Sequence, residues 1–394
     1  MTQPGPVPLR PPPARTGLAD PASLAPHLAR LALLGLLVLT PIWGRDHAAR
    51  LPWLYLVALA FAVALFATPL VRALALRWAV LDVPSGRKVH DMATPLLGGA
   101  AVYCAFAVTV LTSFDFSRPL KGVAVGATLV VAIGILDDVT DLRASLKLLG
   151  HIGAALVAIA YGVVLNIAPH WVPGFVWLNV ALTILWFVTV TNAVQFLDGM
   201  DGLAGGLGVI AGVFFSIAAL QTEQRYLMYL SAALVGACLG FLPYNFRPGR
   251  ARIFLGDSGA TFIGFTLAGL AVMGEWAEDA PMIALLTPAL ILGVPLFDIA
   301  FVGIARIVTG KVHSLPEWLA YTGRDHIHHR FEQLGLTKRQ SVLLIFFLAA
   351  TLGLSALLLK DATPREAVLI LVQAACVLAI VAVVEGVGRW RPRP

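Results

Sequence analysis

Five short polar stretches interrupt an otherwise apolar sequence, and each contains at least one aspartate. They are "DVPSGRKVHDMATPLLGG" at 82–99, "DDVTD" at 137–141, "NAVQFLDGMDG" at 192–202, "NFRPGRARIFLGDSG" at 245–259 and "RDHIHHRF" at 324–331. In the second stretch, Asp138 and Asp141 share a helix face, as do Asp137 and Asp141. Like charges this close repel, and burial near lipid increases that cost. A divalent cation with oxygen ligands, such as Mg²⁺, relieves the repulsion; the alternative is a solvated loop at a helix end.

Two further stretches place aspartates beside glycines. Asp198 and Asp201 are three residues apart, and Gly199 and Gly202 allow close backbone approach or positive φ. This arrangement suits a phosphate or a nucleobase lying against main chain, although an ordinary polar turn would look the same. Asp257 precedes another apolar segment, where the helix dipole favours a carboxylate. It is therefore either a functional carboxylate or a helix cap.

The last stretch combines three histidines with arginines. His326, His328 and His329 lie beside Arg324 and Arg330, and the zinc motif "HExxH" is absent. Imidazoles next to arginine side chains are typical of a site that binds a pyrophosphate. The alternative is a solvated basic loop. Together, the five stretches indicate metal-assisted chemistry on a phosphorylated, nucleotide-linked substrate.

The segments that must position these residues are membrane spans. The chain is 59% hydrophobic and 13% charged over 394 residues, whereas soluble domains carry about 25% charge. Spans of roughly 20 apolar residues must be helical in lipid. The apolar runs are 28–43, 51–76, 96–113, 120–136, 146–165, 174–196, 203–220, 226–243, 259–274, 281–305, 341–359 and 366–386.

These runs predict an all-α polytopic membrane protein, a bundle of about eleven transmembrane helices with one candidate extra helix before it. The transmembrane domain covers 51–387, and a basic tail covers 388–394. The extra span and its linker cover 28–50, after a proline-rich tail at 1–27 that we expect to be disordered.

Charge placement predicts the orientation of the bundle. Lys and Arg concentrate in one alternating set of loops, at 77–95, 137–145, 197–202, 244–258, 306–340 and 387–394. The positive-inside rule places this set in the cytoplasm, and all five polar stretches fall within or beside it. We therefore expect a multi-pass protein of the inner (plasma) membrane with its active site on the cytoplasmic face. A transporter would more often place polar residues at mid-span.

The motifs, in this order, resemble those of the polyprenyl-phosphate N-acetylhexosamine-1-phosphate transferases over roughly 51–387. The matching segments are "RKVH…TPLLGG", "DDVTD", "NAVQFLDGMDGL", "FLGDSG" and "HIHH". The resemblance implies transfer of a sugar 1-phosphate from a UDP-N-acetylhexosamine to undecaprenyl phosphate, with Mg²⁺ and with Mn²⁺ as an alternative, releasing UMP. The "HIHH" form looks like the branch that transfers GlcNAc. The lipid bilayer is the expected environment, a homodimer is one candidate assembly, and no nucleic-acid partner is expected.

The resemblance also suggests roles for individual residues. Asp257 is the expected principal metal ligand, assisted by Gln195 or Asp198; Gln195 stands where the family commonly has asparagine. The catalytic candidates are Asp137, which would deprotonate or orient the lipid phosphate, together with Asp138 and Asp198. Attack by a carboxylate in a two-step route would also fit. The substrate-binding candidates are Lys88, Asn192, Asp201, Gly202, Asn245, Phe254, His326, His328, His329 and Arg330, of which Asp201, Gly202, Asn245 and Phe254 resemble the uridine pocket of the family.

Two other functions were weighed against this one. A UbiA-type prenyltransferase also combines many spans with a "DDxxD" motif, but it needs a second Asp-rich motif, which "DGMDG" matches poorly. A secondary transporter would be favoured by internal inverted repeats, and the sequence shows none.

Overall fold

The structure is a computed structural model, and it describes residues 52–83, 93–113, 117–276, 281–314 and 325–388, with 35, 317, 321 and 323. The predicted tail at 1–27, the candidate span at 28–43 and Lys88 lie outside the described residues.

The described chain forms thirteen helices and one short antiparallel strand pair. The strands are β1 (Leu81–Asp82) and β2 (Thr94–Pro95), with Leu81 opposite Pro95. The helices are α3 (Pro52–Arg77), α4 (Gly98–Ser113), α5 (Arg118–Thr140), α6 (Ala144–Ala160), α7 (Phe175–Leu197), α8 (Leu203–Gln221), α9 (Arg225–Asn245), α10 (Gly256–Met273), α11 (Pro281–Ile291), α12 (Gly293–Val308), α14 (Ile327–Gln333), α15 (Lys338–Lys360) and α16 (Pro364–Gly388).

The all-α polytopic fold is as predicted. Within the described residues, eight helices are long and apolar enough to cross a membrane, and α4 and α6 are shorter apolar helices. Ten of the predicted runs from 51 onward each coincide with one helix to within a few residues. These boundaries follow hydropathy because a helix in lipid must be apolar over its whole crossing.

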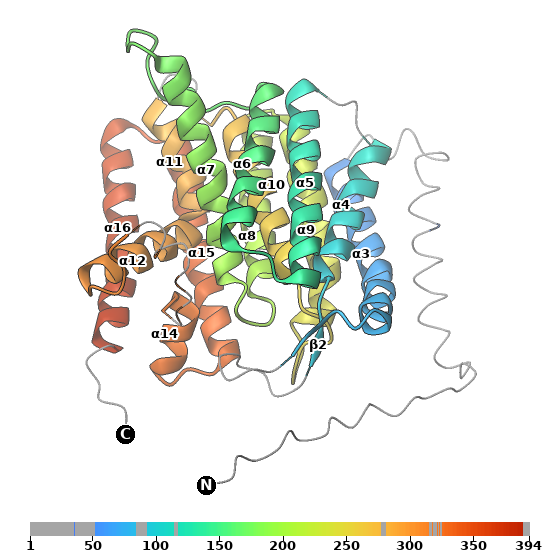
Figure 1. Ribbon diagram of the computed structural model, residues 1–394. Helices are drawn as coiled ribbons and strands as arrows, with labels where there is room; N and C mark the ends of the chain where they lie inside the picture. The colour runs from blue at the N-terminus through green and yellow to red at the C-terminus, as the bar shows by residue number, and fades with distance from the viewer. Residues whose placement is uncertain are drawn as a thin grey trace.

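The predicted span at 281–305 is not one continuous helix. The chain forms two helices there, α11 and α12, which meet at an angle of 86°. Pro295 has no N–H to donate to the carbonyl of Ile291 four residues earlier, so a continuous helix would lose a hydrogen bond at this point. As Figure 1 shows, α12 lies across the bundle instead of along it.

α10 is the centre of the bundle. It packs against α4, α5, α7, α8 and α9, and 78% of its apolar stretch is buried, compared with 17% for α16. Its first turn is closely approached by two neighbours. A Cβ added at Gly99 of α4 would collide with Gly259, and one added at Gly134 of α5 would collide with Ser258. Glycines therefore let three helix backbones meet where α10 begins.

The described parts of the loops predicted to share one side lie at one end of the bundle. In Figure 1 this is the lower end, where the chain leaves α5 and α7, where β2 lies and where α14 packs. The 245–255 connection is tied to the segment before α4: Phe254 N donates to Pro95 O (2.8 Å) and Gly98 N donates to Phe254 O (3.0 Å). The polar segments are thus held against one another at the mouth of the bundle.

Candidate functional site

A cavity of about 810 Å³ opens at this end of the bundle. Its lining comes from segments that are far apart in the sequence and includes many of the predicted site residues. These are Asp137, Asp138, Gln195, Asp198, Asp201, Asn245, Phe254, Asp257 and His329. These carboxylates, which run from Asp137 to Asp257 in the sequence, therefore line one cavity.

Lys147 joins two of these carboxylates. Its Nζ donates to Asp137 Oδ2 (2.9 Å) and to Asp257 Oδ2 (3.0 Å). Asp137 Oδ1 also accepts from the Leu142 backbone N–H (2.8 Å), and the side chain of Asp137 is only 8% exposed. Sequence reasoning missed Lys147, although a lone lysine in the apolar run "ASLKLLGHIGAAL" is unusual enough to suggest a function.

Asp257 and Gln195 are also in contact. Gln195 Nε2 donates to Asp257 Oδ2 at 2.5 Å. The Asp257 side chain is 30% exposed to the cavity, which makes it more accessible than Asp137. Two of the predicted metal ligands are therefore in direct contact, and one of them, Asp257, also contacts the Lys147 ammonium.

Asp138 holds the start of α10. Its Oδ1 accepts from Asp257 N (2.8 Å), and its Oδ2 accepts from Ser258 N (3.3 Å) and Ser258 Oγ (2.7 Å). The first N–H groups of a helix have no partner within the helix, and a carboxylate from α5 satisfies two of them here. Asp138 thus fixes the backbone on which Asp257 sits.

Asp198 lies at the C-terminal end of α7, in the most acidic part of the cavity. Burial raises the pKa of its carboxyl well above the ordinary value, and the charges of Asp257, Asp138 and Asp201 add to the effect. The cavity therefore concentrates more negative charge than Lys147 alone offsets. Several hard oxygen donors close together fit a hard cation such as Mg²⁺. Among the described residues, no three acidic, histidine or cysteine side chains form a group with metal-binding geometry.

The "DGMDG" loop is fastened to the 245–255 connection. Asp201 Oδ2 accepts from Ala251 N (2.9 Å). Gly202 has φ of +81°, and its N–H donates to Asn245 Oδ1 (2.7 Å). Asn245 Nδ2 in turn donates to Ile253 O (3.0 Å). Asn245 is therefore engaged on both amide atoms and braces the wall of the cavity that carries Phe254.

The three histidines occupy different environments. His329 lines the cavity. His328 is 1% exposed and packs against Gly199, where an added Cβ would collide with its Nε2. Burial, and then the charges of His329 and His326, lower the pKa of His328 well below the ordinary value. His326 Nδ1 lies 2.6 Å from Asp298 Oδ2 of α12.

Asn192 and Arg330, two further predicted substrate-binding residues, lie off the cavity. Asn192 Nδ2 donates to Val188 O one turn back in α7 (2.7 Å) and lies 3.4 Å from His151 Nδ1. Arg330 Nε donates to Asp325 O (2.7 Å). Sequence reasoning missed Asp298 and the Arg306 side chain that binds Asp325, both of which stand in the apolar run that forms α11 and α12.

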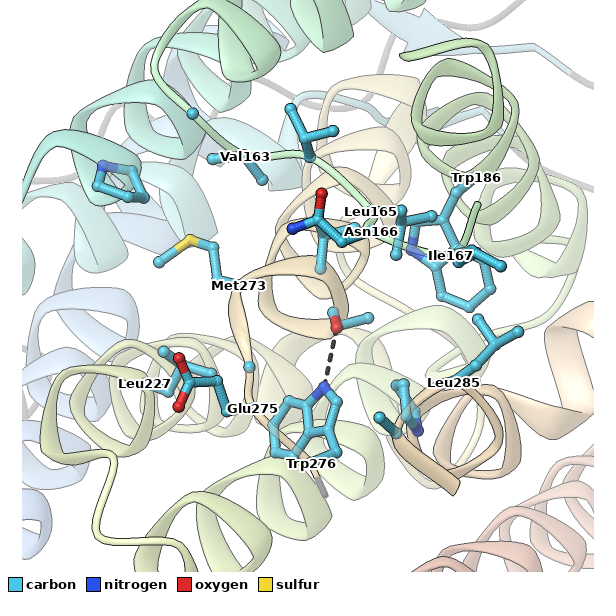
Figure 2. A pocket seen from close by; sticks show the side chains of 18 of the residues that line it. Val163, Leu165, Asn166, Ile167, Trp186, Leu227, Met273, Glu275, Trp276 and Leu285 are labelled. Atoms are coloured by element: carbon cyan, nitrogen blue, oxygen red, sulfur yellow. Dashed lines mark hydrogen bonds between the residues drawn. The ribbon is translucent and has the colours of Figure 1, made fainter. Parts of the chain in front are cut away.

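A second cavity, of about 770 Å³, lies at the opposite end of the bundle. Figure 2 shows its lining of Leu165, Ile167, Trp186 and Met273, with Trp276 Nε1 donating to the Ala271 carbonyl. Glu275 is the only charged residue among the described side chains that line it. Because this described lining lacks a cluster of ionisable groups, we assign the chemistry to the acidic cavity at the other end.

Comparison with known proteins relates the chain to membrane sugar-phosphate transferases. Residues 120–275 match the model of glycosyl transferase family 4. A Bacillus subtilis protein named probable undecaprenyl-phosphate N-acetylglucosaminyl 1-phosphate transferase is 34% identical over 347 residues, covering 86% of this chain and 94% of the relative. The decaprenyl-phosphate N-acetylglucosaminephosphotransferase of Mycolicibacterium smegmatis is 35% identical, covering 74% and 78%. The Escherichia coli undecaprenyl-phosphate alpha-N-acetylglucosaminyl 1-phosphate transferase is 28% identical, covering 72% and 77%.

Proposed function

Because the chain belongs to the polyprenyl-phosphate N-acetylhexosamine-1-phosphate transferase family, we propose that it transfers GlcNAc 1-phosphate from UDP-GlcNAc to undecaprenyl phosphate. A phosphate oxygen of the lipid attacks the phosphorus attached to the sugar, the bond to the UMP oxygen breaks, and UMP leaves. Relatives named as GlcNAc transferases support the sugar. The observation that carries the proposal is the acidic cavity at the end of an apolar bundle, where a soluble donor and a membrane-dissolved acceptor can meet.

The residues around Lys147 suit the meeting of two anionic substrates. The ammonium lies between Asp137 and Asp257, so it would face both the acceptor phosphate and the donor diphosphate. Asp137 would orient the acceptor phosphate or accept its proton. Two hydrogen bonds already reach the carboxylate of Asp137 and make its oxygens poorer nucleophiles, which favours direct transfer over a covalent intermediate.

Mg²⁺ is the proposed cofactor, with Mn²⁺ as a substitute. The residues that would hold it are Asp257, Asp198 and Gln195, which line the same cavity. When bound, the ion would neutralise the diphosphate and the charge that develops on the leaving UMP. The protein's own contribution is to hold Asp257 in place, through the contact of Asp138 with the start of α10.

The cytoplasmic face of the plasma membrane is the proposed location of the site. It is supported by the excess of Lys and Arg in the loops at the end of the bundle that carries the cavity. A homodimer remains a proposal, which the molar mass of the detergent-solubilised protein would test.

The alternatives fit the site less well. A UbiA-type prenyltransferase would use two Asp-rich motifs for one prenyl diphosphate, whereas Asp201 of the "DGMDG" loop accepts from the Ala251 main chain. A transporter would place its polar residues at mid-span, whereas these lie at one end of the helices.

The direct test uses purified full-length protein with undecaprenyl phosphate, Mg²⁺ and a panel of UDP-sugars, followed by mass spectrometry of the lipid. We expect the GlcNAc diphospholipid and an equal amount of UMP from UDP-GlcNAc. A product with a different sugar alone would overturn the choice of sugar. Absence of any lipid product from the whole panel would overturn the proposed reaction.

A further inference from the structure

The buried face of α12 carries two charged side chains. Its buried residues include Val294, Asp298, Val302 and Arg306, which repeat every four positions and therefore form one stripe. Asp298 is 1% exposed and Arg306 is 6% exposed. Buried charges are costly unless they are paired, and both of these are paired with the segment that carries the histidines.

Asp298 holds that segment at two points. Its Oδ2 lies 2.6 Å from His326 Nδ1, and its Oδ1 accepts from the Ile327 backbone N–H at 2.8 Å. An ionised carboxylate can only accept hydrogen bonds, so the proton of this contact is carried by Nδ1. The same contact fixes the plane of the ring, leaving Nε2 as the nitrogen on its opposite side.

His326 does not itself line the acidic cavity, but its ring contacts a residue next to the lining. It packs against Phe196 with ring centroids 5.4 Å apart, and the neighbouring residue Gln195 lines the cavity. Its side chain is 10% exposed, and no described residue forms a hydrogen bond with its Nε2. Nε2 is therefore available to a ligand.

We propose that Asp298 is a positioning residue for the transfer reaction: it keeps the ring proton of His326 on Nδ1, so that Nε2 accepts a hydrogen bond from a hydroxyl or amide N–H of the donor sugar. The proposal rests on the proposed function. The carboxylate fixes one ring nitrogen and the plane of the ring, and the other nitrogen then carries a lone pair and can only accept.

Arg306 supplies a matched comparison on the same helix face. Its Nε and Nη2 donate to Asp325 Oδ2 (3.0 Å) and Oδ1 (2.7 Å). This pair anchors the histidine segment to α12 from the residue adjacent to His326, but among the described residues neither Arg306 nor Asp325 forms a hydrogen bond with an imidazole. If Asp298 were only an anchor, losing either contact would have the same consequence.

The informative variant is Asp298→Asn. An amide offers one acceptor oxygen and one donor nitrogen. If the oxygen keeps the Ile327 N–H, the nitrogen must donate to His326 Nδ1, so the ring proton moves to Nε2, which can then no longer accept a hydrogen bond from the donor substrate. Nitrogen-15 NMR of histidine-labelled protein in detergent, assigned with His326→Gln, should show a protonated Nδ1 in the wild type and an unprotonated Nδ1 in Asp298→Asn.

Kinetics provide the second readout. The kcat for UMP release should fall about 10- to 100-fold in Asp298→Asn, the range typical of a side chain that orients a functional histidine. In a His326→Gln background the same substitution should have no further effect, because coupled residues are not additive. Asp325→Asn should lower thermal stability but keep kcat per folded molecule within about threefold, as expected where no contact with the ring is lost.

Three results would overturn the proposal: Nδ1 that stays protonated in Asp298→Asn, a kcat within about twofold of wild type, or an equal loss in the His326→Gln background. Failure of the wild-type protein to make any lipid product would overturn the proposed function instead, and the NMR comparison would still report on the Asp298–His326 geometry.

Discussion

Lys147 is the residue through which two distant carboxylates meet. Asp137 and Asp257 belong to different helices, and both contact its Nζ. With no cation between them, two carboxylates at this distance would repel, and burial strengthens that repulsion. Lys147 therefore has two consequences: it offsets the repulsion between the two carboxylates, and it presents positive charge where the phosphates must bind.

The first prediction concerns this lysine. Lys147→Met keeps a flexible side chain of similar length but removes the charge. We expect UMP release to fall by at least about 100-fold, the loss typical when one preorganised donor is removed from a charged transition state. Lys147→Arg is the matched control and should retain more activity, since it keeps the cation. A Lys147→Met enzyme within threefold of wild type would show that this contact is only structural.

The second prediction separates metal binding from the orientation of the acceptor. Chelation with EDTA should abolish product formation, and Mg²⁺ should restore it. Asp257→Asn should lose activity sharply and recover part of it at raised Mg²⁺, because one ligand charge is missing. Asp137→Asn should lose about 10²–10⁴ in rate, the range for removal of a general base, with no response to Mg²⁺. Magnesium titrations of UMP release would measure both; full activity in excess EDTA would contradict the metal assignment.

At the scale of helices, the site depends on how α10 begins. Its first turn carries Asp257, and its free N–H groups are satisfied by Asp138 from α5. Gly134, one turn earlier on α5, lets the two backbones approach closely enough for this contact. Asp138 and Asp137 are adjacent in sequence, yet one braces α10 and the other contacts Lys147 in the cavity.

The third prediction tests the brace. Asp138→Ala leaves buried N–H groups unsatisfied, which typically costs about 1–3 kcal/mol. The variant should therefore unfold at a lower temperature and, because Asp257 loses its fixed position, respond weakly to Mg²⁺. Asp141→Asn is the control, since Asp141 is an exposed carboxylate at the end of the same helix and asparagine tolerates its φ of +53°. Thermal unfolding in detergent would measure both variants. Equal unfolding temperatures would contradict a role for Asp138 in holding α10.

For the whole molecule, hydropathy predicted most of the architecture because a lipid-crossing helix must be apolar along its length. It also predicted which polar stretches share an end, because successive spans alternate direction. Two features escaped it. The break between α11 and α12 lies inside one apolar run, where hydropathy gives no sign of a bend and Pro295 is the local sign of one. Lys147, Asp298 and Arg306 are single polar residues within apolar runs, and their partners become known only when the helices are packed.

The last prediction concerns the orientation of the bundle in the membrane. Gln333 and Gln221 are both exposed, and they lie at opposite ends of the bundle. Gln333 is the last residue of α14, at the end that carries the acidic cavity. Gln221 is the last residue of α8, at the end where α9 begins. Each is replaced by cysteine in a background lacking Cys104, Cys238 and Cys376. Because Lys and Arg concentrate at the cavity end, the positive-inside rule predicts that Gln333→Cys is shielded from a membrane-impermeant maleimide in intact cells. Gln221→Cys should be labelled under the same conditions, and both should be labelled after permeabilisation. UDP-sugars are made in the cytoplasm. Labelling of Gln333→Cys from outside would therefore place the site on the opposite side of the membrane from its donor, and would contradict the proposed location. The activity of each variant in membranes would confirm that the labelled protein is folded.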